Sequence, residues 1–263
     1  MRSVRKYGTV LRISLENAFA YRSTAVGGLL FYSLFIFVFF NLWRAIYQGG
    51  EVAGYSLTQM VWYLCITELI VFACRSSVFA QMNEDVKSGN ISYQLNRPYH
   101  YVLYQFFNAL GGMTFNLFLY GALAIVLGLV MVGPIPGFRL YNLPFILLSG
   151  VLGMVINFFL LMTLGLTAFR LEENTAFYFL YQKLVFMLGM FIPVEFLPPW
   201  LQGIARWLPF SYVAWAPGRL FVAFSWDFFW QVIPVQLAWA GVAVSLAFVM
   251  YNFGIRGLQA HGG

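Results

Sequence analysis

The stretch LLFYSLFIFVFFNL, residues 29–42, is interrupted only by Tyr32, Ser33 and Asn41. It lies inside a longer apolar segment, residues 24–47, whose one charged residue is Arg44 near its end. A helix needs about 20 mostly apolar residues to cross roughly 30 Å of hydrocarbon. The segment therefore predicts a transmembrane helix.

The composition of the whole chain agrees with a membrane protein. Of its 263 residues, 61% are apolar and 9% are charged, and the mean hydropathy is +0.76. An ordinary soluble domain carries roughly 25% charged residues, and disordered chains are poor in aromatics, whereas 20% of this chain is aromatic. Cys65 and Cys74 lie in one apolar run and form no disulfide framework. The fold class is therefore predicted to be all-α integral membrane.

Similar apolar segments recur along the chain, and each predicts one membrane-spanning helix. The six predicted spans cover residues 24–47, 57–79, 104–132, 143–169, 177–192 and 228–253. The sequence GPIPG at residues 133–137 breaks the chain after the third span, and Pro193 ends the fifth. An even number of spans places both termini on the same side.

An apolar stretch that is too interrupted for a simple span separates the fifth and sixth predicted helices. Residues 194–226 contain Pro198, Pro199, Pro209 and Pro217. Short helices that dip into the membrane and return fit this pattern, provided that protein buries their backbone groups. An amphipathic loop on the membrane surface fits it equally well. Both alternatives place four tryptophans at headgroup depth, namely Trp200, Trp207, Trp215 and Trp226.

The distribution of Lys and Arg predicts the orientation. Ten of these residues lie on the side of the termini, namely Arg2, Arg5, Lys6, Arg12, Arg22, Arg75, Lys87, Arg97, Arg170 and Arg256. Four lie on the opposite side, namely Arg44, Arg139, Arg206 and Arg219. Because cytoplasmic loops are enriched in Lys and Arg, both termini are predicted to be cytoplasmic, in a multi-pass protein of the cell inner (plasma) membrane.

Residues 1–23 predict a basic amphipathic helix. Apolar side chains recur at helical spacing from Val4 to Phe19, while Arg5, Lys6 and Arg12 occupy other positions. Such a helix is suited to lie along the inner leaflet, where anionic lipid attracts its charges. A solvated helix without membrane contact is the alternative. No cleaved signal peptide is expected, because the first apolar run is too long and no small-residue cleavage site follows it.

Missing motifs argue against several classes of enzyme and motor. The lysines are Lys6, Lys87 and Lys183, and none follows a glycine, so no Walker A loop is present to bind a nucleotide phosphate. The histidines are His100 and His261, and without an H-E-x-x-H motif a zinc hydrolase is not expected. No G-x-S-x-G occurs for a serine hydrolase. We predict no catalytic residue, cofactor site or metal site in this chain, and no nucleic-acid partner.

The longest polar segment, QMNEDVKSGNISYQLNRPYHY at residues 81–101, lies on the predicted cytoplasmic side. Gly89 and Asn90 form a turn, and Ile91 and Leu95 stand at positions i and i+4 of a short helix that ends before Pro98. An amphipathic helix of this kind is able to dock in a cleft of a cytoplasmic partner. A solvated connector between two spans is the alternative.

Two stretches of the chain together resemble a known family. The first contains Glu84-Asp85, Gly89-Asn90-Ile91, Leu95 and Arg97-Pro98. The second contains IP at residues 192–193, FLPPWL at residues 196–201 and WLPF at residues 207–210. They are similar to the coupling segment and the external re-entrant segment of ABC-2 type transporter permeases, and the order of the parts also agrees. The chain resembles most the small single-domain permeases without a fused ATPase; importer relatives with an EAA-type loop match less well.

This resemblance implies the transmembrane permease subunit of an ATP-binding cassette exporter. Two permease subunits, identical or paralogous, would pair in the membrane around a substrate path, each meeting an ABC ATPase that binds ATP and Mg. The implied ATPase-coupling residues are Glu84, Asp85, Gly89, Ile91, Leu95, Arg97 and Pro98. The implied external re-entrant segment includes Pro193, Pro198, Pro199, Trp200 and Pro209. Other partners are membrane lipids, and export is the usual direction in this family.

Two ionisable side chains fall inside predicted spans, Glu68 in the second and Lys183 in the fifth. A charge in mid-membrane costs about 2.5–3.5 kcal/mol and usually faces a partner or water. A rise of about 1.5 Å per residue places both at a similar depth. The resemblance to ABC-2 permeases implies that the second and fifth spans are neighbours that line the substrate path. We therefore predict that Glu68 and Lys183 lie within ion-pair or water-bridged distance on that path. The alternatives are that Lys183 extends toward the cytoplasm and that Glu68 is protonated or bonded to Thr67 or Tyr63.

Two other classes of function remain as alternatives. An ATPase-independent channel or secondary carrier would need no partner motor, but its spans usually show more polar residues along one face. A membrane-embedded enzyme is disfavoured by the shortage of His, Asp and Cys.

Overall fold

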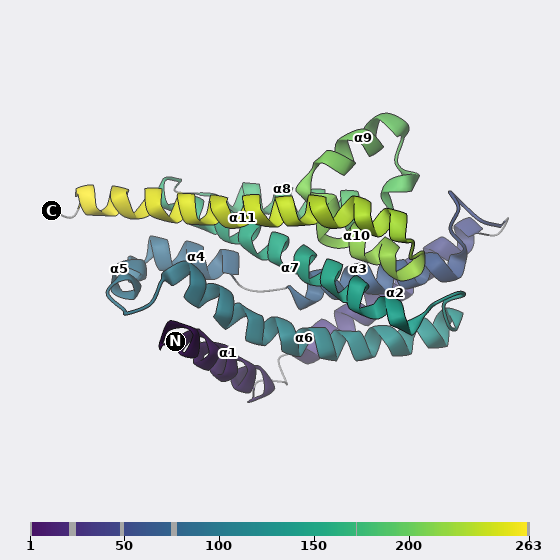
Figure 1. Cartoon of the computed structure of the whole chain (residues 1–263), viewed down its shortest axis with the longest axis horizontal. Helices are drawn as coiled ribbons and strands as arrows, with labels where there is room; N and C mark the ends of the chain where they lie inside the picture. The colour runs from purple at the N-terminus through teal and green to yellow at the C-terminus, as the bar shows by residue number, and fades with distance from the viewer. Residues whose placement is uncertain (1, 21–24, 48–49, 75–77, 172, 262–263) are drawn as a thin grey trace.

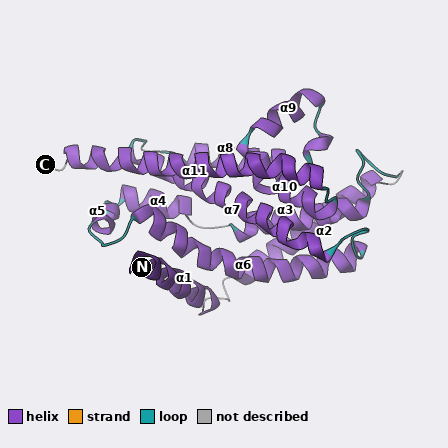
Figure 2. Ribbon diagram, viewed as in Figure 1, coloured by secondary structure: helices purple, strands orange, loops and turns teal. Residues whose placement is uncertain are grey.

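Apolar runs separated by prolines, glycines and polar turns become helices along nearly the whole chain. The computed structural model describes residues 2–20, 25–47, 50–74, 78–171 and 173–261, and apart from one isolated bridge between Val52 and Tyr55 their regular structure is helical (Figure 2). The α-helices are α1 (Arg2–Ala20), α2 (Ala25–Ile46), α3 (Leu57–Ala73), α4 (Val78–Lys87), α5 (Asn90–Leu95), α6 (Tyr101–Val132), α7 (Leu143–Leu166), α8 (Thr175–Val185), α9 (Pro199–Trp207), α10 (Pro209–Val222) and α11 (Trp226–His261). Short 3-10 segments are η3 (Leu140–Asn142), η4 (Thr167–Phe169) and η6 (Val194–Phe196), and η5 (Phe186–Met190) is π-helical.

Among the residues that the structure describes, five helices are long and apolar enough to cross a membrane, namely Val26–Ile46, Leu57–Lys87, Tyr101–Val132, Leu140–Phe169 and Trp226–Arg256. Residues 75–77, inside the second of these, lie outside the described residues. The span expected at residues 177–192 is instead α8 followed by η5, with 11 and 5 residues. At about 1.5 Å per residue this helix covers roughly 24 Å, less than the roughly 30 Å of hydrocarbon. Length and composition thus support five of the six expected spans.

Helical structure extends further into the polar segment 81–101 than the sequence suggests. Val78, Phe79 and Met82 are buried on α4, and this helix continues to Lys87. Residues 81–87, expected as the polar start of a loop, therefore form the last turns of a helix. At the other end of the chain α11 likewise continues beyond residue 253.

Both termini lie at one end of the molecule, and α5 lies there too (Figure 1). We call this the α5 end. The loops at residues 50–56 and 133–142 lie at the opposite end, together with the turn between α10 and α11 (Figure 1). We call this the α9 end. Helix α8 leads from the α5 end, where η4 contacts α4, to η5, which contacts α10 and α3. The path of the chain thus agrees with the expectation that the termini share a side.

Helix α3 lies at the centre of the bundle, packed against α6, α10 and α2. Glycines on two neighbouring helices permit close approach. A Cβ atom at Gly218 of α10 would lie 2.6 Å from Thr67 Cγ2, and one at Gly128 of α6 would lie 2.7 Å from the Trp62 ring. Because a Cβ atom at either position would clash, glycine is what allows α6 and α10 to approach α3 this closely.

A buried polar cluster joins α7, α10 and α11. Ser149 Oγ donates to Gln236 Oε1 at 2.8 Å, and Gln236 Nε2 donates to the Tyr212 carbonyl oxygen at 2.9 Å. Both side chains are 0% exposed. Hydrogen bonds between helices satisfy polar groups that lipid cannot, so the cluster ties three helices together.

The N-terminal segment forms the expected helix, α1, and this helix packs along α6. The rings of Tyr7 and Phe107 stack with centroids 5.3 Å apart, and Ser14 Oγ donates to the Asn108 carbonyl oxygen. Residues 21–24, part of the predicted segment, lie outside the described residues. Part of the apolar face of α1 is therefore used within the chain.

The proline-rich segment 194–226 divides into an exposed and a buried helix. Helix α10 packs between α3 and α7, and most of its side chains are buried. Helix α9 projects from the bundle (Figure 1) and exposes 69% of Trp200 and 79% of Trp207. Trp215, expected at headgroup depth, is 2% exposed in the core. A loop lying wholly on the surface is therefore excluded for α10, whose backbone is buried by protein.

Candidate functional site at the α5 end and the proline-rich segment

Helix α5 is a short arm between the two long helical segments α3–α4 and α6. It begins after Gly89, whose φ of +74° is a left-handed conformation that glycine adopts without strain. Ile91 is 0% exposed and belongs to the hydrophobic core. The chain itself therefore covers this side chain, so Ile91 does not form the outward face of α5, and its role in ATPase coupling stays a prediction. Of Leu95 the structure gives only its place at the end of α5.

The outward face of α5 is formed by other residues. Tyr93 is 70% exposed, and the Arg97 guanidinium lies 5.5 Å from the centroid of its ring. Asn96 and Pro98 are also exposed. A cation over an aromatic ring is a favourable contact, so Tyr93 and Arg97 form one joint surface at the tip of the α5 end.

Three contacts fix the base of this arm. Tyr101 Oη donates to Asp85 Oδ2 at 2.7 Å, joining α4 to the start of α6. Lys6 Nζ donates to the Pro98 carbonyl oxygen, and the His100 backbone N–H donates to Tyr7 Oη at 3.1 Å, joining the arm to α1. Burial lowers the pKa of His100. Asp85 thus holds the base of the arm by accepting the hydrogen bond from Tyr101.

An ion pair connects α4 to the loop before α8. Lys87 Nζ lies 3.7 Å from Glu173 Oε2, and the Thr175 N–H donates to Glu173 Oε1 at 2.8 Å. The hydrogen bond from Thr175 is the main cause that lowers the pKa of Glu173, and Lys87 adds to it. Glu84 is exposed beside this pair, and its carbonyl oxygen accepts from Ser88 Oγ at 2.6 Å.

Among the residues that the structure describes, Glu68 and Lys183 form no direct ion pair with each other. Glu68 is 1% exposed in α3 whereas Lys183 is exposed on α8. Helix α3 does contact η5, but through the neighbouring face: Tyr63 Oη donates to the Gly189 carbonyl oxygen at 2.7 Å and Thr67 Oγ1 to that of Met190 at 3.1 Å. Glu68 follows Thr67 and is therefore turned about 100° away around the helix.

A different charged pair lies in the proline-rich segment, and the sequence did not predict it. Arg219 Nη1 of α10 lies 2.5 Å from Glu195 Oε1 of η6. Tyr55 Oη and Trp215 Nε1 donate to Glu195 Oε2 at 3.2 and 3.1 Å. The Arg219 guanidinium also lies 3.9 Å from the centroid of the Phe228 ring. Burial is the main cause that raises the pKa of Tyr55, and the Glu195 charge adds to it.

The prolines of this segment mark where its helices begin. Pro193 precedes η6, Pro198 and Pro199 begin α9, and Pro209 begins α10. Proline is favoured at the first helical position because no acceptor is available there for an N–H. The chain therefore reverses direction twice, and Glu195 returns to Arg219. The available signal was Glu195, the one acidic residue in a segment that also carries Arg206 and Arg219.

The chain was compared with known protein families and with individual curated proteins. A family model described as ABC-2 family transporter protein matches residues 29–262. The chain belongs to the ABC-2 transporter family. This ABC-2 protein is thus a multi-pass membrane protein with a permease-type domain, which is not itself an ATPase. A search for individual relatives among curated proteins finds no match. Among the described residues of the ABC-2 protein, no group of three or more His, Cys, Asp and Glu side chains is placed to hold a metal ion.

Proposed function

We propose that the ABC-2 protein is the transmembrane permease subunit of an ABC exporter, driven by a separate ATPase that binds ATP and Mg. The α5 arm carries this proposal. It is a short exposed helix between two long apolar helices, at the end of the molecule that holds both termini. In this arrangement the α5 end is cytoplasmic and α9 is on the outer side of the cell inner membrane.

The contacts at the base of the arm support a role in coupling. A displacement of α5 acts on α4 through Gly89 and on α6 through residues 96–100. The hydrogen bond between Asp85 and Tyr101 joins these two helices directly. Because α4 packs on α7 and α1 packs on α6, force applied at Tyr93 and Arg97 would reach most of the bundle.

A co-purification experiment tests the coupling role. The ABC-2 protein would be expressed with an ABC ATPase from a neighbouring gene and isolated in mild detergent. The substitution Arg97→Glu, at an exposed position, is expected to weaken ATPase binding about tenfold, which corresponds to about 1.4 kcal/mol of binding free energy. Arg206→Glu on α9 is the matched control, because it reverses the charge of an exposed arginine at the other end. Equal retention in both variants would contradict the proposal, and uphill transport by the permease alone would favour a secondary carrier.

The exposed face of α8 and η5 supports pairing with a second permease copy or paralogue. Leu180 and Met187 expose 59% and 61% of their surface, and Lys183 is exposed between them. A lysine facing hydrocarbon costs about 2.5–3.5 kcal/mol, whereas a water-filled path between two copies would hydrate it. We therefore place Lys183 on the substrate path. Glu68, being buried, lies behind that surface.

Cross-linking tests this arrangement. With Lys183→Cys, a bifunctional thiol reagent is expected to produce dimers in membranes, because the native Cys65 and Cys74 are buried and unreactive. Val130→Cys on α6 is the control, since this residue is 79% exposed on another face. Dimers at position 130 and none at position 183 would assign the interface to α6 instead.

A further inference from the structure

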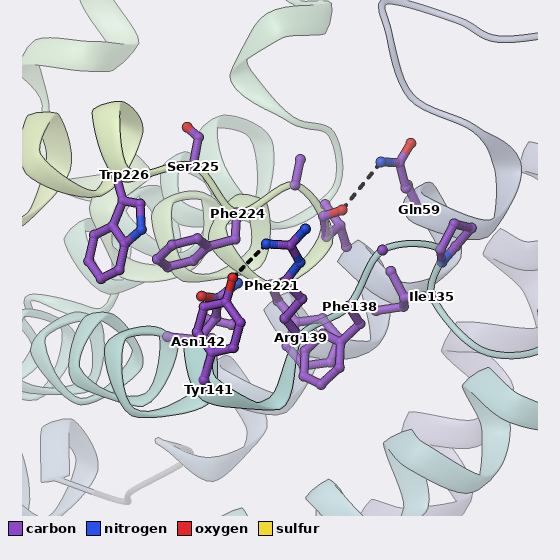
Figure 3. A pocket seen from close by; sticks show the side chains of 15 residues that line it. Gln59, Ile135, Phe138, Arg139, Tyr141, Asn142, Phe221, Phe224, Ser225 and Trp226 are labelled. Atoms are coloured by element: carbon purple, nitrogen blue, oxygen red, sulfur yellow. Dashed lines mark hydrogen bonds between the residues drawn. The ribbon is translucent and has the colours of Figure 1, made fainter.

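A cavity of about 440 Å³ opens at the α9 end, between the loop that follows α6 and the turn that joins α10 to α11. Ligand sites in proteins commonly have volumes of about 300–1,000 Å³. Figure 3 shows aromatic side chains around it, including Phe221, Phe224 and Trp226, with the Arg139 side chain among them. The cavity thus combines aromatic side chains with polar groups and a cation.

Within the described part of the chain, no carboxylate pairs with the exposed side chain of Arg139. The Arg139 guanidinium donates to Tyr141 Oη at 2.7 Å. The long helices α7 and α11 both begin at the cavity, and the positive ends of their dipoles favour an anion there. Asp227 follows Trp226 but does not line the cavity.

Asn142 supplies an independent indication of a ligand. This residue lines the cavity and is only 7% exposed, yet its Oδ1 accepts no hydrogen bond from the described part of the chain. It stands at the N-cap of α7 without capping the helix. A buried acceptor is normally satisfied. A ligand with an anionic group for Arg139 and a hydroxyl or amine donor for Asn142 would complete the site.

The surface beside the cavity indicates how such a ligand arrives. Leu140 is 74% exposed at the mouth, and Leu147 and Val151 expose 49% and 48% of their surface further along α7. In a membrane this apolar face of α7 meets lipid, so an acyl chain can lie along it while its headgroup enters the cavity.

We propose that this cavity binds the headgroup of a phospholipid that carries both a phosphate and a hydroxyl or amine donor. The Arg139 guanidinium pairs with the phosphate, Asn142 Oδ1 accepts the hydrogen bond, and the acyl chains follow α7. The site goes beyond the proposed transport function, since it lies within one subunit and uses no residue of the α5 arm.

Native mass spectrometry of the purified ABC-2 protein tests this site, with phosphatidylglycerol as the added lipid. We expect one retained lipid in the wild type, about tenfold weaker retention in Arg139→Gln and at least threefold weaker retention in Asn142→Leu. Arg206→Gln, which removes an exposed arginine of α9, is the matched control and is expected to retain the lipid. Competition by glycerol 1-phosphate at the same concentration as the lipid would assign the site to soluble phosphates.

Thermal unfolding without added lipid separates a binding role of Asn142 from a structural one. Because its Oδ1 has no protein donor, Asn142→Leu is expected to leave the unfolding temperature unchanged or raised. Phosphatidylglycerol should then stabilise the wild type and not this variant. Lipid retention and lipid-dependent stabilisation equal to the wild type in both cavity variants would overturn the proposal and leave a cavity filled by water alone.

Discussion

The two interrupted segments of this chain, residues 81–101 and 194–226, break the long helices in opposite ways. In the first, α5 stands at the tip of the bundle and exposes polar residues, while its Ile91 side chain is buried. In the second, α10 is inserted between α3 and α7, and the pair of Glu195 and Arg219 is enclosed by aromatic side chains. The polar segment is thus an appended arm, whereas the apolar segment is part of the core.

The difference shows how each segment satisfies its charges. Water solvates the charges of the arm, so its ion pair contributes little. Protein must satisfy the charges of Glu195 and Arg219 in the proline-rich segment, so removing one partner leaves the other in a poorly hydrated site. Substitutions in the two segments should therefore differ in cost.

The largest effect is expected at the enclosed ion pair. Arg219→Met leaves Glu195 with only the hydrogen bonds from Tyr55 and Trp215. We expect a loss of about 3 kcal/mol, the lower limit for a buried pair, because Arg219 and Glu195 are 29% and 18% exposed. Equilibrium unfolding in mixed micelles measures this loss.

A double variant sharpens this prediction. Glu195→Gln combined with Arg219→Met removes both charges and should recover part of the loss. Arg206→Met on α9 is the control, and it should unfold like the wild type because its side chain is exposed. If the single variants Arg219→Met and Arg206→Met have the same stability, the segment is not held by this pair.

The next effect concerns the one buried residue of the arm. Ile91→Ala is expected to cost about 2–4 kcal/mol, as for other buried aliphatic side chains, because Ile91 is 0% exposed. Tyr93→Ala, which is 70% exposed in the native protein, should cost less than about 0.5 kcal/mol. Hydrogen exchange of residues 88–100 measures both, and equal protection in the two variants would show that Ile91 does not anchor the arm.

The long helices were predictable from the sequence because each signal is local. Residues 29–42 contain enough consecutive apolar side chains to require a membrane or a core, whatever the rest of the chain does. The end of α8 was harder to predict. The apolar run continues through η5 to Pro193, and no residue in it signals that the helix becomes π-helical there. Predictions of element type thus depended on nearby residues only.

At the candidate site, the sequence did not show which way a side chain points around its helix, nor which distant residues it contacts. The spacing of Ile91 and Leu95 indicates an apolar face but not which surface covers it, and for Ile91 that surface belongs to the chain itself. For Glu68 the sequence indicated depth, whereas the Tyr63 and Thr67 contacts decide that another face of α3 meets η5. Glu195 and Arg219 meet only because two helices reverse the chain between them.

A smaller effect is expected at the hydrogen bond that joins α4 to α6. Tyr101→Phe removes the donor to Asp85 Oδ2 and keeps the ring. A hydrogen bond to a charged group is worth about 1.5–3 kcal/mol, and we expect the lower limit because Asp85 is only partly buried and water can replace the hydroxyl. Unfolding in mixed micelles measures the loss, with Tyr104→Phe as the control in the same helix. An unchanged stability would mean that water already satisfies Asp85.

The smallest effect is expected at the exposed pair of Lys87 and Glu173, and it should depend on pH. The pKa of Glu173 is lowered below 4.5, first by the Thr175 hydrogen bond and then by Lys87. A carboxyl group whose folded pKa is depressed stabilises the protein above its unfolded pKa, and this contribution is lost as the pH falls through the folded value. A double-mutant cycle of Lys87→Ala and Glu173→Ala should thus give a small coupling at pH 7 that disappears at pH 3. Because water and salt screen an exposed pair, the coupling should also vanish in 1 M salt, as an enclosed pair such as Glu195 and Arg219 should not. A coupling that survives both conditions would show that the arm is held to the α8 loop by packing and not by charge.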